Sequence, residues 1–237
     1  MNVFGMMRVK NEARWIRRAV ESIAPICDRI VVLDDHSTDG TAREAIAGGA
    51  DYNICFSPFD GLDEVRDKNY LLDIALETRP DWIICIDGDE VLRDGAASVL
   101  LTAMKTTLCR ALALPIWYLW DSEGQRRVDG VYGSMTRVSA FRPGPERFEG
   151  TASVFGANFH CGNAPQSIIG RGVVDAPLLH YGYMHREDRI RKFRWYNLND
   201  PMNDKEDRYR HTVQGDIAEV PASARLMHAG PLELRPL

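Results

Sequence analysis

The chain has 237 residues, of which 45% are hydrophobic and 27% are charged, and its formal net charge is −5. This length is enough for a large domain with a sizeable buried core. The mild acidity argues against a nucleic-acid partner, because binding phosphate groups along a nucleic acid needs a basic surface.

The five cysteines are scattered along the chain and form no CxxC pair, so neither a disulfide framework nor a zinc ribbon is indicated. Charged residues follow the N-terminus too early for a signal peptide, and no apolar run approaches the ~20 residues that span a bilayer. We therefore expect a cytoplasmic protein, with a peripheral contact at the inner face of the membrane left open.

The first ninety residues alternate short apolar strands with helical patterns. Strands are predicted at 2–7, 29–35, 51–56 and 82–87, and helices at 11–26, 37–49 and 62–80, with Asn11 as the N-cap of the first helix. Strands that are apolar on both faces and separated by helices indicate a doubly wound, mostly parallel α/β sheet. Ligands of such sheets bind beyond the carboxyl ends of the strands.

After Gly95 the pattern becomes less regular. We expect a helix at 97–108, a strand at 110–120, turn-rich strands around 131–145 and loops with short strands across about 143–176. A further strand is expected within 176–184 and a basic, aromatic helix at 186–199. The chain is interpreted as a single domain over 1–237, with a nucleotide-binding half (1–95), an acceptor-side half (96–200) and a C-terminal tail (201–237).

A cluster of acids ends the last strand of the first half, in the sequence Asp87-Gly88-Asp89-Glu90. The flexible glycine lets both aspartates turn toward one point. Hard divalent cations such as Mg²⁺ or Mn²⁺ favour oxygen ligands and keep positions open for substrate phosphates. An isolated Asp-x-Asp is more often a solvated turn, so the interpretation depends on the other motifs.

Two further motifs follow the first two strands: Asn11-Glu12, and the segment LDDHSTDGT that contains Asp34 and Asp35. Together with the Asp87–Glu90 cluster they resemble the N-terminal half of family 2 glycosyltransferases, which have the GT-A fold. The resemblance covers residues 1–95 and is weaker across 130–195.

The resemblance implies a nucleotide-diphosphate sugar as donor. Asp34 or Asp35 would accept a hydrogen bond from the base, which suits the N3–H of uracil or thymine, and Ser37, Thr38 and Asp39 would form the turn and cap the following helix. The positions expected to bind the donor are Arg8, Asn11, Glu12, Asp34, Asp35, Arg66, Lys68, Asn69, Asp87, Gly88 and Lys192. For Arg66, Lys68 and Asn69 a solvated helix face is an equal alternative.

The resemblance also implies a Mn²⁺ or Mg²⁺ site formed by Asp87, Asp89 and a late histidine. His180 is the preferred ligand because it ends an apolar strand, and His185 is its rival. Glu90 is expected to be structural. Arg189 is the alternative to Lys192 as the side chain that binds the diphosphate.

An inverting transfer needs a base that takes a proton from the acceptor hydroxyl. Glu149 is the first candidate and His160 the second, with Asp121 and Asp129 as alternatives. Relatives often carry an acid directly after such a histidine, whereas this chain has Cys161.

The expected function is therefore metal-dependent, inverting glycosyl transfer from a UDP sugar, or else a dTDP or GDP sugar, to a glycan, lipid-linked or cell-envelope hydroxyl. A sugar-phosphate nucleotidyltransferase is disfavoured because no glycine-rich loop follows the first strand. A haloacid-dehalogenase-like phosphatase is disfavoured because its D-x-D-G-T order is absent. A nucleotide-sugar binder without transferase activity stays an alternative.

Overall fold

The computed structural model describes residues 1–51, 56–150, 161–200, 209–217 and 230–237. Their helices and strands follow in the order β1 (Val3–Val9), α1 (Ile16–Ile23), β2 (Arg29–Asp34), α2 (Thr41–Ala47), α3 (Glu64–Glu77), β3 (Trp82–Cys85), β4 (Glu90–Leu92), α4 (Ala96–Thr106), β5 (Ala111–Trp120), β6 (Ser122–Arg127), β7 (Thr136–Phe141), β8 (Arg171–Val173), β9 (Leu178–His180), α5 (Arg186–Asn199) and β10 (Leu234–Pro236). Short 3₁₀ turns are found at Ala24–Ile26, Gly130–Gly133 and Arg210–Val213.

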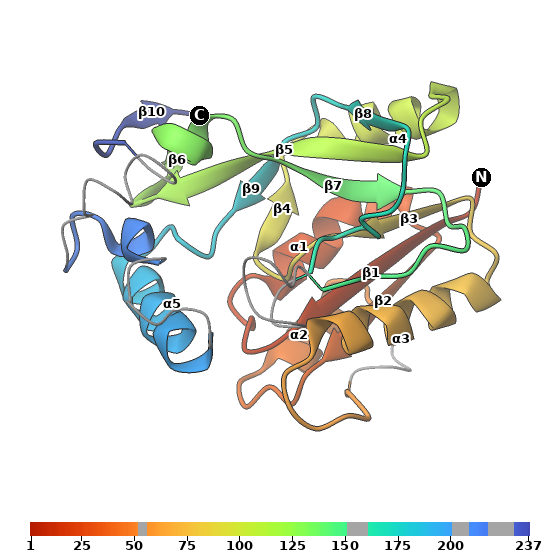
Figure 1. Ribbon diagram of the computed structural model, residues 1–237, viewed down its shortest axis with the longest axis horizontal. Helices are drawn as coiled ribbons and strands as arrows, with labels where there is room; N and C mark the ends of the chain where they lie inside the picture. Colours follow the sequence, from red (N-terminus) through yellow and green to blue (C-terminus); the bar gives the residue numbers. More distant parts are fainter. Residues whose placement is uncertain (52–55, 151–160, 201–208, 218–229) are drawn as a thin grey trace.

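The sheet has a parallel part and a mixed part (Figure 1). Strand β1 pairs in parallel with β2 on one side and with β3 on the other. Beyond β3 the sheet continues through antiparallel β7 to β5, β6 and β10. The predicted strand at 51–56 falls mostly on residues 52–55, which lie outside the described residues.

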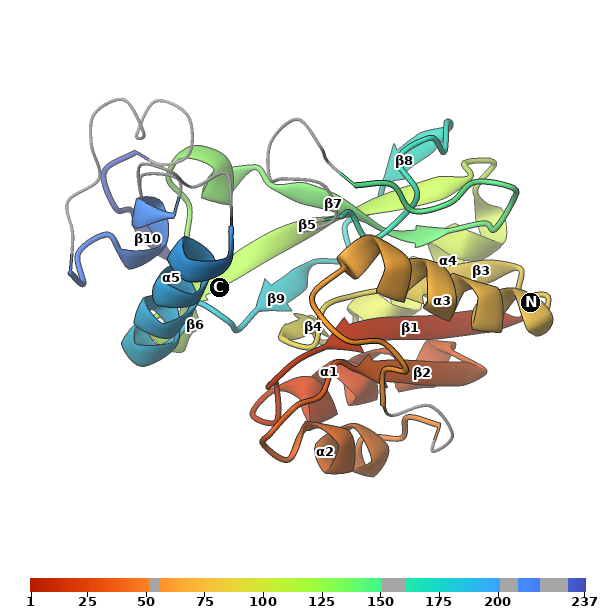
Figure 2. The same ribbon diagram turned by 60° about the horizontal axis from the view of Figure 1, so that its bottom comes forward.

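Helices cover both faces of the parallel strands, as the apolar strands predict. Along β1, Val3 and Met7 belong to a core cluster with α1 and α4, whereas Phe4 and Met6 pack with α3 on the opposite face. Figure 2 shows α3 on one side of β1 and the α1–α2 pair on the other. The doubly wound arrangement of the first half is therefore confirmed.

The second half brings a late strand beside the acidic turn. Strand β9 runs parallel to β5 and antiparallel to β4, so that His180 is paired with Glu90 in the register. Helix α5 follows directly and begins and ends at the predicted residues. It lies far from the N-terminus in both ribbon views (Figures 1 and 2).

The expectation that Asn11 caps the first helix is wrong. Asn11 has a φ of 55°, and α1 begins five residues later at Ile16. Asparagine tolerates this left-handed conformation better than most residues. The backbone N–H of Asn11 donates to Oγ of Ser37 at 2.7 Å and its Oδ1 accepts from the N–H of Thr38 at 2.9 Å. These bonds join the loops that follow β1 and β2.

Among the described residues, no helix combines the length and the apolar character needed to cross a bilayer.

Candidate active site

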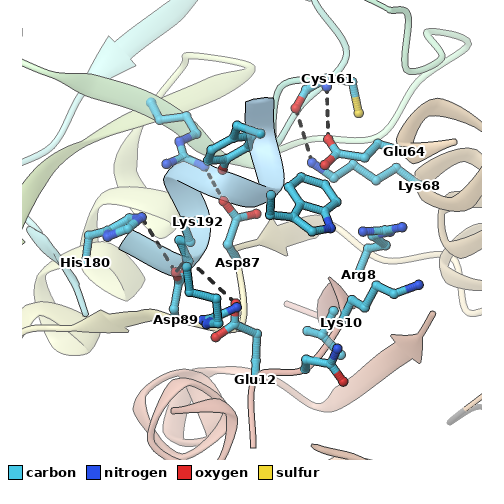
Figure 3. A pocket seen from close by; sticks show the side chains of 17 residues that line it. Arg8, Lys10, Glu12, Glu64, Lys68, Asp87, Asp89, Cys161, His180 and Lys192 are labelled. Atoms are coloured by element: carbon cyan, nitrogen blue, oxygen red, sulfur yellow. Dashed lines mark hydrogen bonds and ion pairs between the residues drawn. The ribbon is translucent and has the colours of Figure 1, made fainter. Parts of the chain in front are cut away.

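A pocket of about 270 Å³ opens at the carboxyl ends of β1 and β3 (Figure 3). Helices α3 and α5 and strands β7 and β9 contribute the rest of its wall. Its lining residues are Arg8, Val9, Lys10, Asn11, Glu12, Glu64, Lys68, Asp87, Gly88, Asp89, Arg137, Cys161, His180, Arg191, Lys192, Trp195 and Tyr196. The pocket therefore lies at the edge where the topology predicts a ligand.

Each acid of the Asp87–Glu90 turn is paired with a cation from a distant part of the chain. Arg137 of β7 binds Asp87 through Nη1 and Glu90 through Nη2, both at 2.5 Å. Lys192 of α5 donates a hydrogen bond to Oδ2 of Asp89 (Figure 3). The turn is thereby neutralised by protein side chains.

Gly88 allows this turn to pack against the end of β1. A Cβ atom at Gly88 would lie 2.8 Å from Cγ1 of Val9 and 3.2 Å from Cβ of Glu12. Contacts this short would push the turn away from β1. The glycine is thus needed for close packing, and it brings Asp87 and Asp89 next to Glu12.

Burial and the two cations divide Glu12 and the three acids of the turn into two groups. Burial raises the pKa of Glu12 to about 8 and that of Glu90 to about 7. Burial also acts on Asp87 and Asp89, but Arg137 and Lys192, respectively, hold the pKa of each below its ordinary value. Asp87 and Asp89 are therefore the ionised pair, and each is bonded to one of the two cations.

The nucleotide-side residues fall into two sets. Arg8 lines the pocket and binds Asp35 at 2.5 Å and Asp67 at 3.2 Å, and Lys10 also approaches Asp35 at 3.3 Å. Asp34 accepts the N–H of Ser37 at 2.8 Å and so holds the turn after β2. Asp34 and Asp35, although buried, do not line the described pocket.

Ser37, Thr38 and Asp39 form the turn that the sequence indicates, whereas the N-cap residue of α2 is Gly40, without a side-chain cap hydrogen bond. Oδ1 of Asp39 accepts the N–H of Thr41 at 2.9 Å, at the beginning of α2, and its Oδ2 accepts the N–H of Ala13 at 3.2 Å. These bonds, like those of Ser37 and Thr38 with Asn11, fix the backbone between β2 and α2.

Three residues of α3 that were expected near the donor are differently placed. Only Lys68 lines the pocket, and its ammonium donates to Oδ1 of Asn163 at 2.9 Å and to the carbonyls of Cys161 and Gly162. Asn69 exchanges two hydrogen bonds with the backbone of Phe148. Arg66 binds Asp67 at 2.9 Å, and neither Arg66 nor Asn69 reaches the pocket.

The expected metal ligands converge only in part. Nε2 of His180 lies 3.7 Å from Oδ2 of Asp89, whereas Asp87 is held by Arg137. Among the residues that the structure describes, no group of three or more His, Cys, Asp or Glu is arranged to hold a metal ion. Asp89 and His180 thus form a pair of donors, and His185, the rival, stacks on Trp15 outside the pocket.

Two features of this pair fit a divalent cation. His180 is 7% exposed, its Nδ1 has no hydrogen-bond partner in the described part of the chain, and burial lowers its pKa to about 4, so that it stays neutral. A neutral imidazole is the form that binds metals. Beside it, Gly182 leaves a space that a Cβ atom would fill, 1.9 Å from Oδ2 of Asp89.

The candidates for the base lie elsewhere. Glu149 is exposed and does not line the described pocket, and His160 lies outside the described residues. Asp129 is buried and bonded to Arg127 at 2.8 and 2.9 Å, which is a structural role. Asp121 accepts from Arg189 at 2.9 Å.

Arg189, the alternative to Lys192 for binding the diphosphate, points away from the pocket. Arg189 is buried, binds Asp216 as well as Asp121, and donates to the carbonyls of Tyr183 and Met184. Its guanidinium anchors α5 to the segment that precedes it. Of the two predicted cations, only Lys192 lines the pocket.

Several residues of the pocket had not been predicted, chiefly Arg137, Arg191, Trp195 and Tyr196. A signal for Arg137 was available, because it is a lone cation within the otherwise uncharged strand Thr136–Phe141. The face of α5 that meets the pocket could not be chosen, because cations occur on all sides of that helix.

Comparisons with known proteins agree with this geometry. A family model described as Glycosyl transferase family 2 matches residues 6–152. An uncharacterized protein of Mycobacterium tuberculosis is 25% identical over 211 residues, which are 85% of this chain and 51% of that protein. An uncharacterized glycosyltransferase of Rickettsia bellii is 39% identical over 83 residues, which are 35% of this chain and 26% of that protein.

A solved structure matches almost the whole chain. The crystal structure of S. aureus TarS superposes with a TM-score of 0.54 at 13% identity, covering 94% of this chain and 44% of that chain. This likeness confirms the GT-A-type fold. The chain spans about half the length (51%) of the mycobacterial relative that it matches over most of its sequence.

Proposed function

This chain belongs to glycosyl transferase family 2, and we propose that it transfers a sugar from a nucleotide-diphosphate donor to a hydroxyl acceptor with inversion at the anomeric carbon. UDP is the favoured nucleotide, with dTDP or GDP as alternatives. The acceptor is a glycan or a lipid-linked or cell-envelope molecule, which a protein in peripheral contact with the membrane could reach.

The charge of the pocket is the observation that carries this proposal. The chain has a net charge of −5, yet its pocket is lined by six basic side chains and four acidic ones. The basic residues are Arg8, Lys10, Lys68, Arg137, Arg191 and Lys192, and the acidic ones are Glu12, Glu64, Asp87 and Asp89. A positive surplus beside an ionised aspartate pair suits a diphosphate that is bound together with a divalent cation.

The donor set fits Mn²⁺ or Mg²⁺, with Asp89 and His180 as the protein ligands and Asp87 beside them. Such a cation, when bound, neutralises the charge that develops on the departing diphosphate. Arg191 and Lys192, from α5, close the pocket next to the acidic turn and would bind phosphate oxygens. Trp195 and Tyr196 of the same helix provide an aromatic wall against which a nucleotide or sugar ring can pack.

Differential scanning fluorimetry with UDP, GDP and dTDP, each with and without Mn²⁺, tests the proposal, because a ligand that binds the folded state raises the melting temperature. We expect a metal-dependent rise with one of the nucleotides. Asp89→Asn should abolish the Mn²⁺ contribution, whereas Asp73→Asn, on the exposed face of α3, should retain it.

No metal-dependent shift with any of the three nucleotides would refute the proposal. Transfer from a radiolabelled nucleotide sugar, measured with the same protein, separates an enzyme from a protein that only binds the donor.

A further inference from the structure

Lys192 occupies the position on Asp89 where a divalent cation is expected. Its ammonium is hydrogen-bonded to Oδ2 of Asp89, the oxygen that also faces Nε2 of His180 at 3.7 Å. Nζ lies 3.8 Å from Oε1 of Glu12, and the side chain is only 14% exposed. The ammonium therefore sits among the donors that would ligate the metal.

The space for this ammonium depends on Gly182. A Cβ atom at that position would lie 1.9 Å from Oδ2 of Asp89 and 2.3 Å from Nζ of Lys192. The absence of a side chain at Gly182 therefore creates the room in which Asp89, His180 and a cation meet. Because the ammonium and a metal ion would occupy the same space, only one of them can bind there at a time.

We propose that Lys192 and the divalent cation occupy the same position on Asp89 in turn. The ammonium holds the position in the free protein, and it leaves when the metal ion and the diphosphate arrive together. This inference rests on the proposed function, since it requires a diphosphate donor bound with a metal ion.

The exchange follows from charge. Two cations cannot share one carboxylate oxygen without strong repulsion, so a metal ion on Asp89 displaces Lys192. The released ammonium of Lys192 stays within the pocket, where it can form an ion pair with the diphosphate. The diphosphate thus favours metal binding and the metal favours diphosphate binding, and this coupling is reciprocal.

Mn²⁺ titrations followed by electron paramagnetic resonance test the exchange. The proteins are the unaltered chain, Lys192→Met, Lys192→Arg and the control Arg194→Met, each with and without UDP at 0.15 M salt. Arg194 is a matched control because it lies on the same helix but is exposed outside the described pocket, and its loss removes the same charge.

Lys192→Met should bind Mn²⁺ without UDP on the order of tenfold to a hundredfold more tightly than the unaltered chain, because a charge-assisted hydrogen bond that competes with the metal has been removed. UDP should then improve Mn²⁺ binding much less than it does in the unaltered chain. Lys192→Arg keeps the charge and should stay close to the unaltered chain. Arg194→Met, which removes a charge outside the pocket, should change the affinity at most about threefold.

If Lys192→Met and Arg194→Met bind Mn²⁺ equally tightly without UDP, while UDP still improves Mn²⁺ binding by the unaltered chain, the exchange is overturned and the proposed function stands. No Mn²⁺ binding by any variant, with or without UDP, would overturn both. Melting temperatures establish that each variant is folded, and Lys192→Gln replaces the methionine variant if that one does not fold.

Discussion

Nη1 of Arg137 lies 2.5 Å from Oδ2 of Asp87, although the two residues are 50 positions apart in the chain. The same guanidinium binds Glu90, whose side chain is fully buried. Arg137 thus reduces the electrostatic repulsion among the three acids of this turn. It also connects β7 to the turn that follows β3.

Arg137→Met should destabilise the fold by about 3 kcal/mol, because removing one partner leaves a buried charge uncompensated. Urea denaturation at pH 8 measures the loss. Arg110→Met is the control, since Arg110 forms a two-bonded pair with Glu146 at the surface, where solvent screens the pair, and its loss should cost much less than that of Arg137. Similar losses for the two variants would contradict the structural role of Arg137.

Glu12→Gln should change how stability depends on pH. Burial raises the pKa of Glu12 to about 8 from an ordinary value of 4.5, so between these values the folded state keeps a proton that the unfolded state releases. This group therefore lowers stability as the pH rises from about 4.5 to 8. The glutamine variant does not titrate, so its free energy of unfolding does not fall in this way. The difference in the free energy of unfolding between the variant and the unaltered chain should therefore rise by about 1–3 kcal/mol from pH 5 to pH 8.5.

Urea denaturation at both pH values checks the effect of Glu12. Glu21→Gln, on the exposed face of α1, is the control and should leave the pH dependence as it was. If Glu12→Gln changes the free energy of unfolding by the same amount at both pH values, the ionisation of Glu12 is not involved.

Gly182→Ala should destabilise the fold by about 1–3 kcal/mol and weaken Mn²⁺ binding, because the new methyl group overlaps Asp89 and Lys192. Gly124→Ala is the matched control, since the nearest atom to its Cβ would be 4.0 Å away. Thermal unfolding and Mn²⁺ titration give the two readouts. An alanine variant that keeps both properties would show that the turn after β9 can move aside.

Lys68→Met should cost about 2–4 kcal/mol, because three acceptors in residues 161–163 lose a charged donor. Hydrogen exchange at the backbone amides after Cys161 should become faster, since this segment is no longer tied to α3. The control Lys105→Met removes an exposed lysine from α4 and should alter neither quantity. Unchanged exchange in Lys68→Met would mean that other contacts hold the segment.

Much of the first half could be predicted from sequence, because apolar runs and helical periodicity are local. Helix α3 and the strand at Trp82 were predicted for that reason. The short strand Glu90–Leu92 was missed, because it exists only through its pairing with β9. The helix start at Asn11 was misjudged because its side chain bonds to the next loop instead of to a helix N–H.

The sequence indicates where the site lies more accurately than what each of its residues contacts. Asp87, Asp89 and His180 could be placed at one edge because strand ends meet there. That Lys192 binds Asp89, and that Arg189 turns into the protein, depends on how α5 is rotated, which tertiary packing decides. Glu149 and His160 remain predictions for the base.

The pairing of Asp89 with Lys192 also has a consequence for the order in which the protein is made. Asp89 leaves the ribosome 103 residues before Lys192, which at typical elongation rates is roughly 5 to 20 s. Throughout this interval the nascent sheet carries its acids without the cation that binds Asp89. A fragment that ends near residue 95 lacks both Lys192 and Arg137 permanently, so we expect residues 1–95 to fold stably only when the later half of the chain is synthesised with them.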